Sequence, residues 1–337
     1  MKAWEIVSDD GIGALALNER EMPVPGHGEI LVEVGASSIN YRDLSTVLAP
    51  AARNLPYPTI PNSDCAGTVT RVGPGVSGFA EGERVMGCFF ADWISGPITP
   101  QAMASALGGA VDGVLAEYVV LKADGAVKVP DHLTLEEAAT LPCAAVTAWH
   151  ALQAGRPVTA GDTVLLLGTG GVSVFAQQFC NLLGAETIVT SSSDAKLQRM
   201  RDLGAGQTIN YKTIEAWDAA VVDMTGGGVD RVIEVGGPGT LQKSITAARI
   251  GGTVALIGIL TGAGGAVVPT DIMRKSLTVQ GIYVGAQRMF QDMSRAIGLH
   301  QLHPVIDEVF GFEAARDAYT CMKNAGHFGK IVIRVQP

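Results

Sequence analysis

TVLLLGTGGVSVFAQQFCNLL, residues 163–183, is the stretch of sequence on which the fold assignment depends. Its first part, Val164–Leu167, is an all-apolar run, which is typical of a parallel β-strand buried on both faces. Gly168, Gly170 and Gly171 follow, and the remaining residues have apolar positions at helical spacing. A strand, a glycine turn and a helix in this order predict a dinucleotide-binding turn.

The residue types in this turn suit a bound pyrophosphate. Gly168 permits a tight turn, and Gly170 and Gly171 lack the Cβ that would keep backbone N–H groups away from a phosphate. The helix N-terminus adds partial positive charge, and we include Val172, its next residue, among the expected cofactor contacts. The third position of the usual G-x-G-x-x-G pattern is Ser173. Taken alone, the segment therefore also fits an ordinary glycine-rich turn of an α/β protein.

The composition excludes several classes of protein. A length of 337 residues favours two domains, and 47% hydrophobic residues are enough for sizeable cores. A net charge of −9, with no block of lysines or arginines, argues against nucleic acid as a partner. No apolar run reaches the roughly 18 residues of a membrane span, and the first residues are too polar for a signal peptide. The five cysteines are scattered without a C-x-x-C pair, so a cytoplasmic location is the simplest interpretation.

The N-terminal part of the chain has the pattern of a β-rich domain. Short alternating or apolar runs lie at Ile30–Val34, Gly67–Val72, Glu83–Met86 and Ala116–Leu121, and turn residues divide them. Residues 89–113 are the least regular part. We interpret them as a long excursion, either a lid or a dimer-contact lobe.

The pattern changes near Pro130. Thr134 opens a capping-box sequence that predicts a helix to about Leu141, and a second helix is expected over Ala144–Gln153. Strands and helices then alternate, which predicts a parallel sheet with right-handed crossovers and places the chain in the α/β class. After Val164–Leu167 the expected strands are Thr187–Thr190, Thr208–Asn210, Arg231–Val235, Thr253–Ile257 and Leu277–Ile282. The expected helices are Asp194–Leu203, two that follow Trp217 and Thr240, Met289–His300 and Glu313–Asn324, with two last strands at Val305–Phe310 and Lys330–Val335.

Four other segments carry a family resemblance. They are SINYRD at residues 38–43, DCAGTVTRVG at 64–73, LPCAAVTAW at 141–149 and HFGKIV at 327–332. Together with the glycine turn, they resemble the medium-chain dehydrogenase/reductase superfamily. They are most similar to its zinc-independent, quinone-oxidoreductase-like branch. The resemblance covers essentially the whole chain in the right order.

This resemblance implies a fold and an assembly. A GroES-like catalytic domain, residues 1–127 and 287–337, would surround a Rossmann NADP-binding domain at 128–286, with the active cleft between them. Members are usually homodimers or homotetramers, and the strand Leu277–Ile282 would pair across a two-fold axis.

The resemblance also implies where a catalytic zinc ion would be held. Zinc-dependent members use a cysteine, a histidine and a second cysteine, and the matching positions here are Asn40, Ser63 and Cys143. One thiol cannot supply the three ligands that a catalytic zinc requires, and the cysteine cluster of the structural zinc is missing as well. We therefore expect no metal. A weak improvised site made of Asp43, Asp64 and Cys143 remains the alternative.

The second expected strand bears on the choice of nicotinamide cofactor. NAD sites usually carry a carboxylate at its tip, but here the strand ends in serines, and Asp194 lies later, at the start of a helix. Ser191 and Ser192 offer hydroxyl groups to a 2′-phosphate, and Lys196 offers charge. In NADPH-using relatives, a lysine in this segment and a tyrosine that matches Tyr211 hold that phosphate. NADP(H) is therefore favoured over NAD(H), although Lys196 also fits a solvated surface lysine.

The family implies further contacts with the cofactor. These residues are Thr147 near the nicotinamide, Gly236, Gly258 and Ile259 at strand ends, and Tyr283, Phe328 and Lys330, which would close the site.

The absence of zinc ligands limits the chemistry that we expect. Quinones and α,β-unsaturated carbonyls spread the charge that forms on hydride transfer, so they need only a hydrogen-bond donor. Asn40 and Tyr41 lie where the zinc ligands are missing and are the catalytic candidates. The sequence thus predicts an NADPH-dependent reductase of a quinone, enone or aldehyde. An alcohol dehydrogenase of the same superfamily and a non-catalytic NADPH-binding protein remain alternatives.

Overall fold

The computed structural model describes residues 1–336 and divides the chain into two compact units. One unit contains Met1–Val146 and the segment from Gly285 onward, and the other is the continuous segment Thr147–Val284. The first boundary between the units falls after Val146, whereas the predicted boundary lay between residues 127 and 128. The reason is that the capped helix after Thr134 and the turn around Cys143 pack on the sheet of the first unit, not on that of the second.

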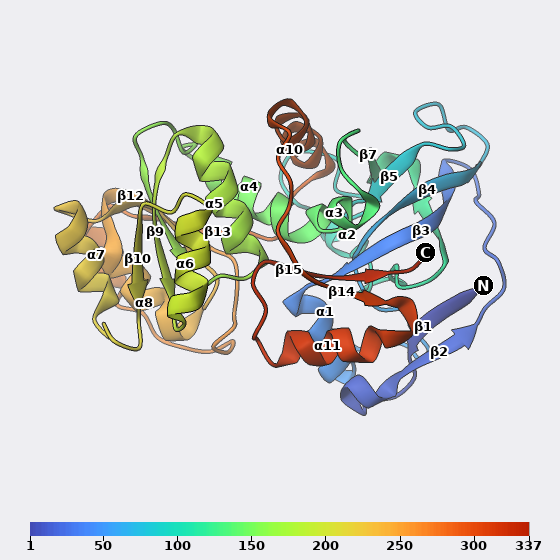
Figure 1. Ribbon diagram of the computed structural model, residues 1–337, viewed down its shortest axis with the longest axis horizontal. Coiled ribbons are helices and arrows are strands. Elements are labelled where there is room, and N and C mark those ends of the chain that lie inside the picture. The colour runs from blue at the N-terminus through green and yellow to red at the C-terminus, as the bar shows by residue number, and fades with distance from the viewer. Residues whose placement is uncertain (337) are drawn as a thin grey trace. The chain divides into compact units, whose positions relative to one another are not determined.

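The first unit is built on a mixed sheet with the strand order β14-β15-β3-β4-β5-β7, and β6 pairs with β3 (Figure 1). Its strands are β1 Lys2–Ile6, β2 Leu15–Glu19, β3 Glu29–Ile39, β4 Asp64–Val72, β5 Arg84–Gly87, β6 Tyr118–Lys122, β7 Ala126–Lys128, β14 Ile306–Gly311 and β15 Lys330–Arg334. Its helices are α1 Tyr41–Leu48, α2 Pro100–Met103, α3 Leu135–Ala138, α10 Gln287–His300 and α11 Ala315–Lys323. Neighbours in this sheet come from distant parts of the chain, since β15 pairs antiparallel with β3.

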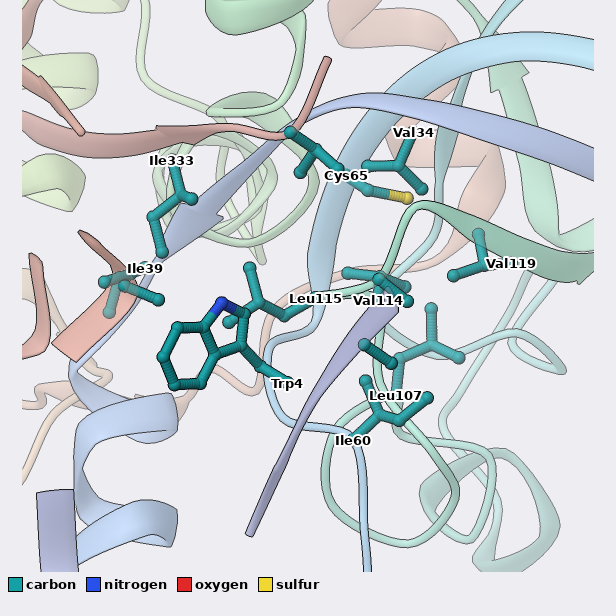
Figure 2. Close-up of a cluster of buried hydrophobic side chains, with 14 of the residues drawn as sticks. Trp4, Val34, Ile39, Ile60, Cys65, Leu107, Val114, Leu115, Val119 and Ile333 are labelled. Atoms are coloured by element: carbon teal, nitrogen blue, oxygen red, sulfur yellow. The ribbon is translucent and has the colours of Figure 1, made fainter. Parts of the chain in front are cut away.

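The core of the first unit lies where the strands and loops bring apolar side chains together (Figure 2). Trp4, Ile39, Cys65, Leu115 and Ile333 are among the buried residues, which come from four strands and one loop. The indole Nε1 of Trp4 donates a hydrogen bond of 2.8 Å to the carbonyl oxygen of Phe312, so this polar atom is not left unpaired in the core.

The second unit contains a parallel sheet with the strand order β10-β9-β8-β11-β12-β13 (Figure 1). Its strands are β8 Thr163–Leu167, β9 Glu186–Ser191, β10 Gln207–Asn210, β11 Val229–Glu234, β12 Ala248–Leu256 and β13 Thr278–Gly281. Its helices are α4 Val146–Gln153, which begins at the boundary, α5 Gly171–Leu183, α6 Asp194–Asp202, α7 Trp217–Thr225, α8 Pro238–Ala247 and α9 Pro269–Arg274. The strand order reverses between β8 and β11. In such sheets this switch point is where ligands bind, beyond the carboxyl ends of the strands.

The predicted strands of both units are confirmed, although several extend by a few residues. The largest extension is β3, which runs to Ile39 and so reaches Asn40 directly. The helix predicted to end at Leu141 is wrong in its second half. It ends at Ala138, and a π-helical turn over Leu141–Ala145 follows, because Pro142 has no N–H to donate to the preceding turn.

The irregular segment at residues 89–113 folds back on itself. The backbone N–H of Leu107 donates to the carbonyl oxygen of Phe89 at 3.0 Å, and that of Ala91 donates to Ser105 at 3.3 Å. Phe89 is 2% exposed, so its side chain belongs to the interior of the unit. Across residues 1–336, no helix has the length and apolar character that crossing a membrane requires.

Candidate functional site

A connected group of polar side chains lies at the position that the family resemblance assigns to a catalytic zinc ion. Asn40 follows β3, Ser63 and Asp64 lie at the start of β4, and Lys330 is the first residue of β15. These strands are neighbours in the order β15-β3-β4, which brings the three strand ends together. Cys143 reaches the same place from the π-helical turn. We call these five residues the Asn40 cluster.

A continuous path of hydrogen bonds joins the Asn40 cluster. The ammonium Nζ of Lys330 donates to Asn40 Oδ1 at 2.7 Å and to the carbonyl oxygen of Ile39 at 2.9 Å. The other end of the amide, Asn40 Nδ2, donates to Ser63 Oγ over 3.4 Å. Ser63 Oγ in turn donates to Asp64 Oδ1 at 2.6 Å. The backbone N–H of Cys143 completes the path by donating to Asp64 Oδ2 at 3.0 Å.

Asp43 fixes the backbone of Asn40. Its Oδ2 accepts the backbone N–H of Asn40 at 2.8 Å, which is half of a capping box at the start of α1. Its Oδ1 is paired with Arg42 Nη1 at 3.2 Å, and the same guanidinium nitrogen donates to the carbonyl oxygen of Leu107. Asp43 therefore orients the loop that carries Asn40.

Burial sets the charges in the Asn40 cluster. It raises the pKa of the Asp64 carboxyl from 3.8 to about 6, while the charge of Lys330 and the hydrogen bond from Ser63 oppose the shift. Burial also lowers the pKa of Lys330, and the nearby carboxylates oppose that shift. The pKa of the Cys143 thiol lies well above its usual value, again because of burial.

The residues of the Asn40 cluster do not fit a zinc ion. A catalytic zinc needs at least three ligands from Cys, His, Asp or Glu, whereas this cluster offers only the carboxylate of Asp64 and the thiol of Cys143 beside an amide, a hydroxyl and an ammonium. The ammonium of Lys330 already binds the oxygen of Asn40. Over the part of the chain that the structure describes, no group of three or more His, Cys, Asp or Glu side chains could hold a metal. The expected absence of zinc stays a prediction.

Tyr41, the second catalytic candidate, lies in a different environment from Asn40. It is the first residue of α1 and is 46% exposed, whereas Asn40 is 8% exposed. The structure thus places Asn40, and not Tyr41, inside the hydrogen-bonded cluster.

The predicted pyrophosphate turn lies between β8 and α5. Gly168 has φ +75°, a value that favours glycine, and its N–H donates to Thr190 at 2.8 Å. Gly170 is the N-cap of α5, and a Cβ added there would have no described neighbour within 4 Å. Packing inside the chain therefore does not require glycine at position 170. The close approach of a phosphate to the backbone N–H groups would require it. Gly171 and Val172 form the first turn of the helix, where N–H groups point outward.

Ser173 explains how the turn tolerates the loss of its third glycine. The residue is 1% exposed, and its Oγ donates to the carbonyl oxygen of Leu167 at 2.7 Å. The hydroxyl ties the helix to the end of β8 in place of the close packing that a glycine gives.

Four residues predicted for the 2′-phosphate gather at one corner of the parallel sheet. Ser191 ends β9, and its carbonyl oxygen accepts the N–H of Tyr211 at 3.1 Å. Ser192 and Lys196 lie between the end of β9 and the first turn of α6. Tyr211 is 42% exposed. These residues share a place, and their contact with a cofactor stays a prediction.

Sequence reasoning missed two residues, Asn210 and Glu234, that shape the second unit. Asn210 Nδ2 donates to Asp194 Oδ1 at 2.8 Å, so the carboxylate nearest to the serine tip already has a partner. Glu234 is fully buried and accepts the backbone N–H groups of Gly236 and Gly237 at 2.7 and 2.9 Å. An acidic residue at a strand end next to a Gly-Gly pair is the signal that could have revealed the second case.

The strand ends at β11 and β12 hold three more predicted contacts. The N–H of Gly258 donates to the carbonyl oxygen of Glu234 at 3.2 Å, so the residues after the two strands are joined. A Cβ at Gly258 would lie 2.1 Å from the carbonyl oxygen of Val235, which explains why glycine is needed there. Gly236 lies in the turn that Glu234 holds, and Ile259 is 56% exposed.

The remaining predicted contacts are divided between the two units. Thr147, which is buried, and Tyr283, which is 45% exposed, belong to the second unit. Phe328 and Lys330 belong to the first unit and are both buried, and the N–H of Phe328 donates to Asp307 at 3.0 Å. Their contact with a cofactor stays a prediction.

Two family models match the chain in the order of its two units. The alcohol dehydrogenase GroES-like domain matches residues 26–131, and the zinc-binding dehydrogenase matches residues 171–299. A zinc-type alcohol dehydrogenase-like protein, C1773.06c of Schizosaccharomyces pombe, is 42% identical and covers 98% of this chain and 98% of its own. The 2-methylene-furan-3-one reductase of Solanum lycopersicum is 29% identical over 100% of this chain and 80% of its own.

Solved structures of similar proteins share the fold over nearly the full length. A crystal structure named as an alcohol dehydrogenase from Sinorhizobium meliloti has a TM-score of 0.91 at 39% identity. The match covers 99% of this chain and 100% of that chain. An NAD-dependent alcohol dehydrogenase has a TM-score of 0.91 at 31% identity, with 100% of both chains covered. The mycobacterial protein Rv1454c, solved with NADPH, has a TM-score of 0.83 at 26% identity and covers 99% of this chain and 100% of its own.

Proposed function

The chain belongs to the medium-chain dehydrogenase/reductase superfamily, whose members act on small molecules with a nicotinamide cofactor, and we propose that it is an NADPH-dependent, zinc-independent reductase of quinones or α,β-unsaturated carbonyls. The single observation that carries this proposal is the Asn40 cluster. Asn40, Ser63 and Cys143 stand where the family resemblance would need three zinc ligands, and the cation there is Lys330.

The residues of the cluster suit an acceptor that disperses charge by itself. Dihydronicotinamide supplies the hydride when it is bound. Asn40 Nδ2 would donate a hydrogen bond to the acceptor oxygen, on which negative charge grows as the hydride arrives. Water would then give one proton to the enolate or to the hydroquinone anion that hydride transfer forms. A simple ketone needs stronger polarisation than one neutral amide gives, so we expect it to react slowly.

The preference for NADPH rests on the corner of the sheet that holds Ser191, Ser192, Lys196 and Tyr211. The last residue of β9 is a serine and not an aspartate or glutamate. The nearby carboxylate of Asp194 accepts a hydrogen bond from Asn210. The structure of the mycobacterial relative with NADPH agrees with this choice, while the NAD-dependent relative makes the comparison of both cofactors necessary.

A substitution at Lys196 tests the preference. We expect Lys196→Ala to raise KM for NADPH about tenfold, because a charge-assisted hydrogen bond to phosphate is worth roughly 1.5–3 kcal/mol. KM for NADH should stay within about twofold of the wild type, since NADH lacks the phosphate. Lys212→Ala, a nearby surface lysine, is the matched control. Equal effects of Lys196→Ala on both cofactors would overturn the assignment.

A panel of acceptors tests the reaction. NADPH oxidation should proceed with a quinone or an enone and be much slower with ketones, and it should survive treatment with a chelator. Loss of activity on chelation would instead favour an alcohol dehydrogenase, which the name of the 42% identical relative supports as the second candidate. Tight NADPH binding without turnover on any acceptor would favour a non-catalytic binding protein.

We also infer a homodimer or homotetramer in the cytoplasm. The parallel sheet ends at β13, so one edge of this strand has no partner strand within the described chain. Light scattering of the purified protein would overturn this inference if it gave the mass of one chain.

A further inference from the structure

We infer that Lys330 is a positioning residue, which fixes the Asn40 amide so that its N–H₂ end is available to the acceptor oxygen. This inference rests on the proposed function. It gives the buried ammonium of Lys330 the role of directing the hydrogen bond from Asn40 to the acceptor oxygen.

An asparagine side chain can be turned by 180° with little change in shape, so a neighbouring group must select which end faces a ligand. The ammonium of Lys330 has donors and no acceptor, and it lies 2.7 Å from the Asn40 amide. Only the oxygen end of the amide satisfies it. The nitrogen end is then directed away from Lys330.

The nitrogen end of Asn40 is held less tightly than the oxygen end, although the amide also interacts with the Asp64 carboxylate. Its partner Ser63 Oγ is 3.4 Å away, at the long limit of a hydrogen bond, and Ser63 already gives its proton to Asp64 at 2.6 Å. An acceptor oxygen at a normal distance of about 2.9 Å would therefore compete well for an N–H of this amide.

The position of Lys330 is fixed independently of Asn40. The ammonium also donates to the carbonyl oxygen of Ile39 at 2.9 Å, and the backbone of Lys330 lies opposite Ile306 of β14 in the sheet. Lys330 is 3% exposed and is accompanied by the carboxylates of Asp43 and Asp64, which compensate its charge. A cation bound to the amide oxygen also strengthens the N–H groups as donors.

The test compares Lys330→Met with Lys330→Arg and Asn40→Ala. We expect Lys330→Met to lower kcat about 10- to 100-fold with a quinone or enone, in the range for the loss of an oxyanion donor or less. Lys330→Arg, which keeps the charge and the donors, should recover most of kcat. In the double variant, Lys330→Met should add little to the effect of Asn40→Ala, because both changes remove the same interaction.

Two further measurements separate this role from others. Lys275→Met is the matched control, because Lys275 also donates to several backbone carbonyl oxygens but lies in the second unit. It should leave kcat near the wild-type value. Calorimetric titration should show that Lys330→Met weakens an enone bound to the NADP⁺ complex about tenfold, with NADPH affinity changed less than threefold.

A large loss of NADPH affinity at unchanged kcat would overturn the inference and make Lys330 a cofactor ligand. Additive effects in the double variant, or failure of Lys330→Arg to recover kcat, would overturn it as well. If the wild type reduces no quinone or enone, the proposed function fails. The binding titration then still decides whether Lys330 controls the affinity of Asn40 for a carbonyl oxygen.

Discussion

Asp64 is a buried carboxyl group whose ionisation costs stability. Its side chain is fully buried, and its pKa of about 6 in the folded chain lies above the ordinary 3.8. The folded state therefore binds the proton more tightly than the unfolded state. The stability that this proton contributes is present below about pH 4 and is lost as pH rises through 6.

This gives a prediction for the pH dependence of stability. A rise in pKa from 3.8 to about 6 corresponds to about 3 kcal/mol at most. Between pH 4.5 and 7.5, the wild type should lose free energy of unfolding relative to Asp64→Asn, which cannot ionise. Urea denaturation at several pH values measures the difference. Parallel pH profiles for the two proteins would show that Asp64 does not titrate in this range.

The partners of single residues were the part of the site that the sequence predicted least well. The missing zinc ligands could be read from the positions of Asn40, Ser63 and Cys143 by resemblance. The contact between Lys330 and Asn40 could not, because these residues are 290 positions apart and meet only through the pairing of β15 with β3. For the same reason Lys330 was predicted only as a cofactor contact.

At the scale of elements, the alternation of strands and helices in the second unit was predictable because each buried parallel strand is a short apolar run. Helix ends near Cys143 were less predictable. The capping box at Thr134 marked the start of α3 correctly, but the helix ends after one turn, and a π-helical turn follows. The hydroxyl of Thr140 donates to the carbonyl oxygen of Glu137 at 2.6 Å, an interaction that propensity does not reveal.

The capping box makes a prediction for stability. Thr134 Oγ1 accepts the N–H of Glu137 at 3.2 Å, and Glu137 Oε2 accepts the N–H of Thr134 at 2.9 Å. Thr134→Ala should therefore lower the free energy of unfolding by about 1 kcal/mol. Thr134→Ser keeps the hydroxyl group and should stay within about 0.5 kcal/mol of the wild type. Urea denaturation that fails to separate the two variants would contradict the role of the cap.

At the scale of the whole molecule, the two units differ in how the chain forms them. The second unit is one continuous segment, Thr147–Val284, with its own parallel sheet and hydrophobic core. The first unit needs the end of the chain, because β15 lies between β14 and β3 in its sheet.

This difference predicts the behaviour of fragments. A fragment of residues 147–284 should fold alone and unfold cooperatively in urea, because it contains a complete core. A fragment of residues 1–146 should not, since it lacks β14 and β15 and leaves the end of β3, at residues 36–39, without its partner strand. Circular dichroism during urea titration measures both. A cooperative transition in the N-terminal fragment alone would contradict the prediction.

The place of β15 also sets an order of events during synthesis. The ribosome makes the segment that becomes β3 long before the strand that pairs with it, so the first sheet stays incomplete until β15 has been made. The second unit can form while the chain is still growing. Since Lys330 is the first residue of β15, the ammonium that orients Asn40 arrives with that strand, and catalytic competence should not appear before β15 has paired with β3.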